Sequence, residues 1–226
     1  MSLIWPIVKK TLLFLWDESF LLVIFNVLTV IIVAGGPVLL MTGLTGSIES
    51  LLLGAPLLLA MPLAIFGLFW LTYQISEGKA VKFSAYFLGA KALLKPAYVW
   101  GGINLGVGFL LATNIAFYRG QGAAWGIYAA AFFAGLTLFW FALQLLALSL
   151  YPRLVEPGFK LAIRNALVLL GMRPTAALAL LLLSLIVIVL GMFVPLTAII
   201  ISFSFVALLT NVTTAEILKD SEQNNE

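Results

Sequence analysis

The chain has 226 residues, the length of one ordinary domain, but 63% of them are hydrophobic and only 9% are charged. A water-soluble domain needs roughly 25% charged residues, so the composition excludes one, and the mean hydropathy of +1.17 indicates an integral membrane protein. Cysteine and histidine are absent, which excludes thiol nucleophiles, disulfides and imidazole-ligated metals. We therefore expect a protein that is not an enzyme, with no catalytic residues, no metal site and no cofactor.

Uncharged apolar segments divide the chain into membrane spans. A helix needs about 20 mostly apolar residues to cross a hydrocarbon core of about 30 Å. The sequence predicts an all-α polytopic membrane protein, with one integral membrane domain over residues 1–218 and a solvated acidic tail over 219–226. The six predicted spans are approximately 19–41, 51–73, 97–118, 123–150, 175–190 and 195–215.

The boundary between the last two spans depends on one short segment. The chain carries no charge over residues 175–215, about twice the length that one spanning helix needs. Gly191 and Pro195 favour a tight turn, because glycine ends helices and proline fits the first turn of the next one. The alternative is one long helix that is kinked at Pro195.

The positions of lysine and arginine predict the orientation of the chain, because cytoplasmic loops of membrane proteins retain positive charge. If the N-terminus is inside, all but one of the twelve basic residues lie on the inner side, and Arg119 is the exception. This asymmetry predicts a multi-pass plasma-membrane protein with both termini in the cytoplasm.

The inner connections are predicted to contain amphipathic helices that lie in the membrane interface. Between 151 and 174, apolar residues from Phe159 to Leu170 recur at helical spacing. Residues 74–96 show a less regular version of the same apolar pattern, and a third such pattern precedes Ser19. Cations on such helices face anionic headgroups. We expect contacts with anionic lipid on the inner face from Lys160, Arg164, Arg173, Lys82, Lys91 and Lys95.

The predicted unit of one interfacial helix followed by one transmembrane hairpin recurs at a regular interval along the sequence. Lys82 precedes Lys160 by the same distance along the chain as Asn26 precedes Asn104. A true internal repeat would produce this period. Any protein that alternates short outer loops with long inner loops would produce it as well, so the sequence leaves both interpretations open.

The predicted spans contain amides and hydroxyls but no ionisable residue at depth, which disfavours coupled transport through an acidic relay. Asn26, Asn104 and Gln144 each lie about 10 Å from the inner boundary at 1.5 Å per residue. We therefore predict one intramembrane polar layer. Its amides either join the helices by hydrogen bonds, which is their commoner role, or form a small-solute site that opens inward.

Three groups of residues carry a family resemblance: Asn26-Val27-Leu28 leading to Gly36-Pro37-Val38, Phe83-x-x-x-Phe87-x-x-x-Lys91 running into Trp100, and Leu150-Tyr151-Pro152-Arg153-Leu154 followed by Arg164-Asn165-Ala166 and Pro174. This pattern resembles the YesL-like family of bacterial integral membrane proteins. The resemblance implies a bacterial plasma-membrane protein that is often encoded near carbohydrate uptake and breakdown systems. The resemblance implies no catalytic residues for this chain.

Two classes of function remain open. The first is a non-catalytic accessory or scaffold component, with a membrane protein partner or a second copy of itself and no nucleic acid. The alternative is a small-solute transporter or a substrate-binding membrane subunit of an uptake system. Gly101, Gly102, Gly106 and Gly108 in the third span permit close approach of a neighbouring helix, which favours the first class.

Overall fold

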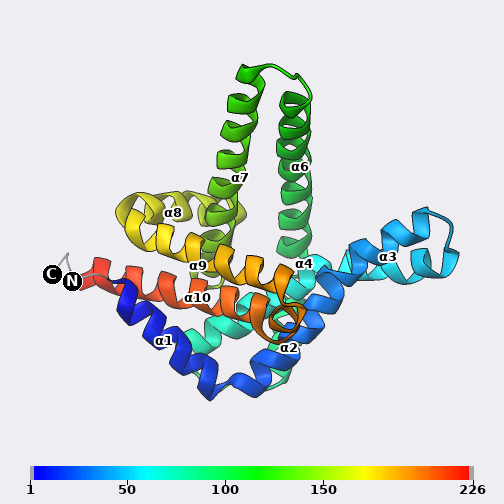
Figure 1. The fold of residues 1–226 in the computed structure, drawn as a ribbon. Helices are drawn as coiled ribbons and strands as arrows, with labels where there is room; N and C mark the ends of the chain where they lie inside the picture. Colours follow the sequence, from blue (N-terminus) through cyan, green and yellow to red (C-terminus); the bar gives the residue numbers. More distant parts are fainter. Residues whose placement is uncertain (1–2, 224–226) are drawn as a thin grey trace.

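The computed structural model describes residues 3–223, which form ten α-helices joined by short turns (Figure 1). No strand occurs within these residues. The helices are α1 (Ile4–Asp17), α2 (Ser19–Val33), α3 (Gly35–Leu44), α4 (Ile48–Ser76), α5 (Ser84–Ala92), α6 (Leu94–Arg119), α7 (Ala124–Leu150), α8 (Phe159–Met172), α9 (Pro174–Phe193) and α10 (Pro195–Gln223). A short 3₁₀ turn, η1 (Tyr151–Arg153), follows α7.

Within residues 3–223, six helical segments are long and apolar enough to cross a membrane. The prediction of an all-α polytopic membrane protein with six transmembrane helices is confirmed. The segments are Ser19–Leu44, Ile48–Ser76, Leu94–Arg119, Ala124–Arg153, Pro174–Phe193 and Pro195–Gln223.

The first spanning segment is interrupted, whereas the sequence predicts a continuous helix over 19–41. α2 ends at Val33 and α3 begins at Gly35. Pro37 lies in the first turn of α3, where it has no backbone N–H to donate to the preceding turn. Proline is a common cause of helix breaks, so its position explains the interruption.

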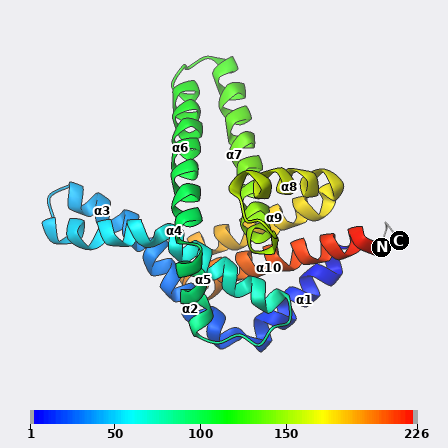
Figure 2. The same cartoon turned by 180° about the vertical axis from the view of Figure 1, so that it is seen from behind.

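The final apolar stretch forms two helices that lie side by side (Figures 1 and 2). Val194 separates α9 from α10 and has a non-helical backbone, with φ −125° and ψ 87°. A Cβ atom added to Gly191 would lie 3.1 Å from the Cβ of Ala198, so the glycine allows the two helices to approach closely beside the turn. The predicted division at residues 191–195 is correct, and one long kinked helix is excluded.

The first residues of the predicted solvated tail are helical in the structure. Residues 219–223 continue α10 as far as Gln223, and residues 224–226 lie outside the described part of the chain. Arg173 forms an ion pair with Asp220, and Lys219 approaches Glu216 at 3.9 Å in the preceding turn. The Arg173–Asp220 pair holds the end of α10 against the junction of α8 and α9, so this part of the tail is ordered structure.

The same order of elements occurs three times along the chain. A short helix (α1, α5 or α8) precedes a long hairpin, formed by α2–α3 with α4, by α6 with α7, and by α9 with α10. The three predicted amphipathic segments are therefore helical. Helix α1 lies beside the last turns of α10 (Figures 1 and 2), and Lys10 pairs with Glu216 at 2.8 Å.

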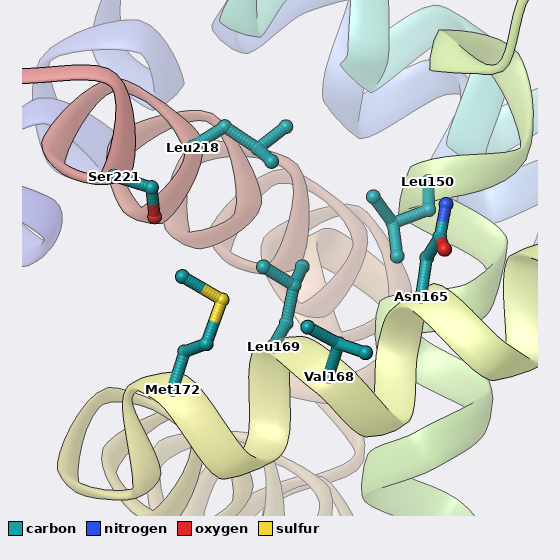
Figure 3. A pocket seen from close by; sticks show the side chains of 7 residues that line it. All are labelled: Leu150, Asn165, Val168, Leu169, Met172, Leu218 and Ser221. Carbon is teal, nitrogen blue, oxygen red and sulfur yellow. The ribbon is translucent and has the colours of Figure 1, made fainter. Parts of the chain in front are cut away.

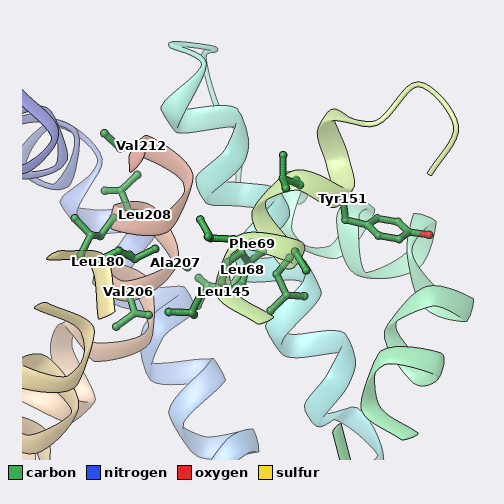
Figure 4. Close-up of a cluster of buried hydrophobic side chains, with 14 of the residues drawn as sticks. Leu68, Phe69, Leu145, Tyr151, Leu180, Val206, Ala207, Leu208 and Val212 are labelled. Atoms are coloured by element: carbon green, nitrogen blue, oxygen red, sulfur yellow. The ribbon is translucent and has the colours of Figure 1, made fainter. Parts of the chain in front are cut away.

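The buried core lies where the hairpins converge. It is formed by residues 22–29 of α2, 64–76 of α4, 142–150 of α7, 176–184 of α9 and 202–217 of α10, a region that we call the base. Lipid is as apolar as leucine, so burial here stabilises the fold through packing and hydrogen bonds more than through removal from water. Figure 4 shows part of this core, including Leu68, Phe69, Leu145, Leu180, Val206, Leu208 and Val212.

Helix α5 packs along α4 (Figure 2), and its aromatic side chains contact Phe25 of α2. The rings of Tyr86 and Phe25 stack with centroids 4.3 Å apart. A Cβ atom at Gly67 would lie 2.9 Å from the carbonyl oxygen of Tyr86, so this contact requires glycine. Burial raises the pKa of the Tyr86 phenol, and its hydrogen bond with Thr29 partly opposes that shift. The phenol therefore stays neutral, and α5 is fixed to the base.

The α6–α7 hairpin projects away from the other helices (Figure 1). Ala97, near its start, is the one buried residue of α6. In α7 the continuous buried segment is confined to residues 142–150, at the end nearest the base. Most of this hairpin therefore presents its apolar side chains outward.

Candidate functional site

The most extensive polar cluster in the base is centred on Arg153, whose side chain is only 9% exposed. Its Nη1 atom donates to the Ser149 carbonyl oxygen at 2.6 Å and to Asn211 Oδ1 at 2.7 Å. Its Nη2 atom donates to Ser76 Oγ at 3.0 Å, to Glu77 Oε1 at 3.1 Å and to the Asn211 carbonyl oxygen at 3.2 Å. One guanidinium thus joins α4, α7 and α10.

Local sequence explains why Arg153 turns inward. Pro152 has no N–H to continue the helix, so α7 ends at Leu150 and passes into η1. The guanidinium is brought back over the last carbonyls of α7, where the helix dipole favours a cation. Its Cζ atom also lies 4.7 Å from the centre of the Tyr73 ring, a favourable cation–π contact.

Asn211 completes this cluster from α10. Its Oδ1 atom accepts from Ser149 Oγ at 2.8 Å as well as from Arg153. Its Nδ2 atom donates to Thr72 Oγ1 at 2.9 Å and to the Phe69 carbonyl oxygen at 3.2 Å. These bonds use the hydrogen-bonding capacity of the amide, so the cluster acts as a cross-link between helices and offers no free group for chemistry.

A second polar cluster surrounds Asn26, which is fully buried. Its Nδ2 atom donates to the carbonyl oxygens of Ala198 and Ile199 at 2.9 and 2.6 Å. Its Oδ1 atom accepts from the backbone N–H of Ser204 at 2.9 Å, and Ser204 Oγ donates to the Leu22 carbonyl oxygen at 2.7 Å. Asn26 thus joins α2 to α10.

The third polar cluster lies between α6 and α7. Gln144 Oε1 accepts from Trp100 Nε1 at 2.7 Å and from Asn104 Nδ2 at 3.1 Å, while Asn104 Oδ1 accepts from Trp140 Nε1 at 3.0 Å. The structure therefore brings together two residues of the predicted polar layer, Asn104 and Gln144. It places Asn26 in the separate cluster on α10, so the three amides form two clusters. Gln144 Nε2 is buried without a partner in the described structure.

The residues predicted to contact anionic lipid fall into three groups. Lys82, Lys91 and Lys95 are exposed on and beside α5. Lys160 and Arg164 are exposed on α8 and border a surface hollow. Arg173 differs from the others, because its guanidinium is paired with Asp220. Lys160 and Arg164 are therefore the cations best placed to receive a ligand in a formed site.

A smaller pocket of about 180 Å³ separates α8 from the ends of α7 and α10 (Figure 3). Asn165 and Ser221 contribute its polar groups, and Ser221 Oγ already donates to the Ile217 carbonyl oxygen at 2.8 Å. The remaining lining is apolar: Leu150, Val168, Leu169, Met172 and Leu218. Within residues 3–223, no group of three or more acidic side chains is placed to hold a metal ion.

Sequence reasoning missed the Arg153 cluster. Arg153 was counted only as one of the inner cations, and Asn211 and Ser149 were not grouped with it. The available signal was the position of Arg153 directly after Pro152 at the end of an apolar segment, because a cation there lies within reach of the preceding helix end.

Comparisons of the chain with protein-family models, curated proteins and solved structures find no match. The class of protein therefore rests on the helices themselves. Six long apolar helices, joined by short connections and stabilised by buried polar clusters, define an all-α multi-pass membrane protein.

Proposed function

We propose that this protein is a non-catalytic accessory or scaffold component of the bacterial plasma membrane. In this proposal both termini and the inner ends of the hairpins lie on the cytoplasmic side, and the α6–α7 hairpin binds a partner membrane protein. The distribution of basic residues supports the orientation. The resemblance to YesL-like proteins supports a partner that belongs to a carbohydrate uptake system.

The polar side chains of the Arg153 and Asn26 clusters are already hydrogen-bonded within the protein, which supports a structural role for the base. The side chains of Arg153, Asn211 and Asn26 form hydrogen bonds with groups on neighbouring helices. A solute site in a membrane bundle would need convergent polar groups that remain free to face a cavity. The two hollows on α8, of about 180 and 400 Å³, lie at the surface and not among these clusters.

The α6–α7 hairpin carries the proposal of a partner. No residue in the most apolar part of α6 is buried, whereas 56% of the corresponding part of α10 is buried. Cβ atoms added to Gly102 and Gly106 would meet no atom within 4 Å, so this face of α6 is open. Small residues spaced by four allow a second membrane helix to approach the backbone closely.

Site-specific photocrosslinking tests this proposal in intact cells. A photoreactive amino acid at Leu105, which is 76% exposed on α6, should form a discrete adduct with a membrane subunit of a carbohydrate uptake system. The same amino acid at Leu182, an exposed position on α9, is the matched control and should react with lipid alone. An adduct from Leu105 with lipid alone would contradict the accessory role, and an adduct with a second copy of the chain would contradict the proposed uptake-system partner.

A further inference from the structure

A hollow of about 400 Å³ opens where the chain leaves η1 and enters α8. The segment before α8 forms one side, and the first turns of α8 form the other. The hollow is lined by Glu156, Pro157, Gly158, Lys160, Leu161 and Arg164.

The charges around this hollow form an unusual set. Lys160 and Arg164 are four residues apart on α8, so their side chains lie on the same face of the helix. Glu156 lines the hollow with them. Within residues 3–223, none of the three takes part in a salt bridge. The hollow thus offers two cations and one carboxylate to a ligand.

Pro157 and Leu161 give the same hollow an apolar part of its lining, and Val155 precedes its first lining residue in the chain. Val155, next to Glu156, is 100% exposed, and Leu161 on α8 is exposed as well. An exposed valine beside a charged hollow suits a ligand that has an apolar part next to its polar group. Because the helix that carries these cations directly precedes a spanning helix, α9, a membrane phospholipid meets this requirement better than a soluble phosphate ester.

We propose that this hollow binds the headgroup of an aminophospholipid, a lipid that carries both a phosphodiester and a primary ammonium. Lys160 and Arg164 receive the phosphate, to which the planar guanidinium can donate two parallel hydrogen bonds. The carboxylate of Glu156 receives the ammonium, and Val155 and Leu161 contact the upper part of the acyl chains. A purely anionic headgroup would leave Glu156 facing a like charge.

This inference rests on the proposed placement of α8 at the inner membrane surface but is independent of the partner proposed for α6–α7. The phospholipid test uses the purified chain alone, so either proposal can fail without the other. Full-length protein in detergent is titrated with phosphatidylethanolamine, phosphatidylglycerol or phosphatidylcholine of matched acyl chains, and bound lipid is measured by native mass spectrometry.

The wild-type protein should retain phosphatidylethanolamine at least about fivefold better than the other two lipids. Changing Lys160→Gln and Arg164→Gln together should lower its retention about tenfold or more, since each cation contributes to phosphate binding. Glu156→Gln should reverse the preference, so that phosphatidylglycerol is retained better than phosphatidylethanolamine. The matched control, Lys91→Gln with Lys95→Gln, removes the same charge near α5 and should leave the preference unchanged.

Several results would overturn the proposal. Equal retention of the three lipids by the wild-type protein would remove the specificity, and an unchanged preference in Glu156→Gln would show that the carboxylate does not receive the ammonium. Lipid retention that survives loss of both cations would place the lipid elsewhere. Displacement of the lipid by an equal concentration of soluble phosphoethanolamine would show that the hollow takes the free headgroup ester instead of a membrane lipid.

Discussion

Changing Asn211→Leu should lower the free energy of unfolding by about 3 kcal/mol, because it removes a buried hydrogen-bond acceptor from a charged group. The substitution removes the Oδ1 atom that accepts from Arg153 at 2.7 Å and the Nδ2 atom that donates to Thr72 Oγ1 at 2.9 Å. The guanidinium then remains buried with fewer acceptors. Denaturation of the purified protein in detergent, followed by circular dichroism, measures this loss.

A double-mutant cycle separates this interaction from a general packing defect. Arg153→Met alone should also destabilise the protein, because the carbonyl oxygens of Ser149 and Asn211 and the carboxylate of Glu77 lose their cationic donor. The combined variant should lose less stability than the sum of the two single losses, since it removes both polar partners together. Arg119→Gln at the exposed end of α6 is the control and should stay within about 0.5 kcal/mol. Strictly additive losses would contradict the coupling that we assign to this pair.

Changing Asn26→Leu should lower the free energy of unfolding by about 1–3 kcal/mol. This is the cost of leaving the buried Ser204 N–H without an acceptor. The same change removes two hydrogen bonds to the Ala198 and Ile199 carbonyl oxygens. Leucine has a similar volume, so lost polar contacts rather than a cavity account for the effect. The same denaturation measurement in detergent detects it.

Asn114 provides a matched control for this substitution. It lies on α6 and donates to the Leu110 carbonyl oxygen within its own helix at 2.7 Å. Asn114→Leu makes the same chemical change without breaking a bond between helices, so the stability should fall by less than about 0.5 kcal/mol. Equal effects of the two substitutions would show that Asn26 does not join α2 to α10 as described.

Much of the fold could be predicted because the bilayer imposes strong constraints on sequence. A span needs a long uncharged apolar segment, and such segments are visible without knowledge of neighbouring helices. The turn at Val194 was predictable because Gly191 and Pro195 mark it locally. The break at Ala34 was not predicted, although Pro37 marks it, since an apolar composition alone does not distinguish a straight span from an interrupted one.

The partners of the buried polar residues could be predicted from the sequence only in part. The depth of Asn26, Asn104 and Gln144 can be counted along their helices, and depth correctly suggested that Asn104 and Gln144 could meet. Depth does not determine which neighbour a helix face meets, so the separation of Asn26 could not be seen. The Arg153 cluster depends on Asn211, which lies 58 residues away in sequence and meets it only through packing of α10 against α7.

The central claim is that the chain crosses the membrane six times with both of its ends on the cytoplasmic side. Because the natural chain has no cysteine, single-cysteine variants of the full-length protein can be labelled with a membrane-impermeant maleimide in intact cells. Thr45→Cys and Gln121→Cys, at the tips of two hairpins, should label directly. Lys82→Cys and Glu222→Cys should label only after the membrane is permeabilised. Labelling of Glu222→Cys in intact cells, or protection of both tip positions, would contradict the account.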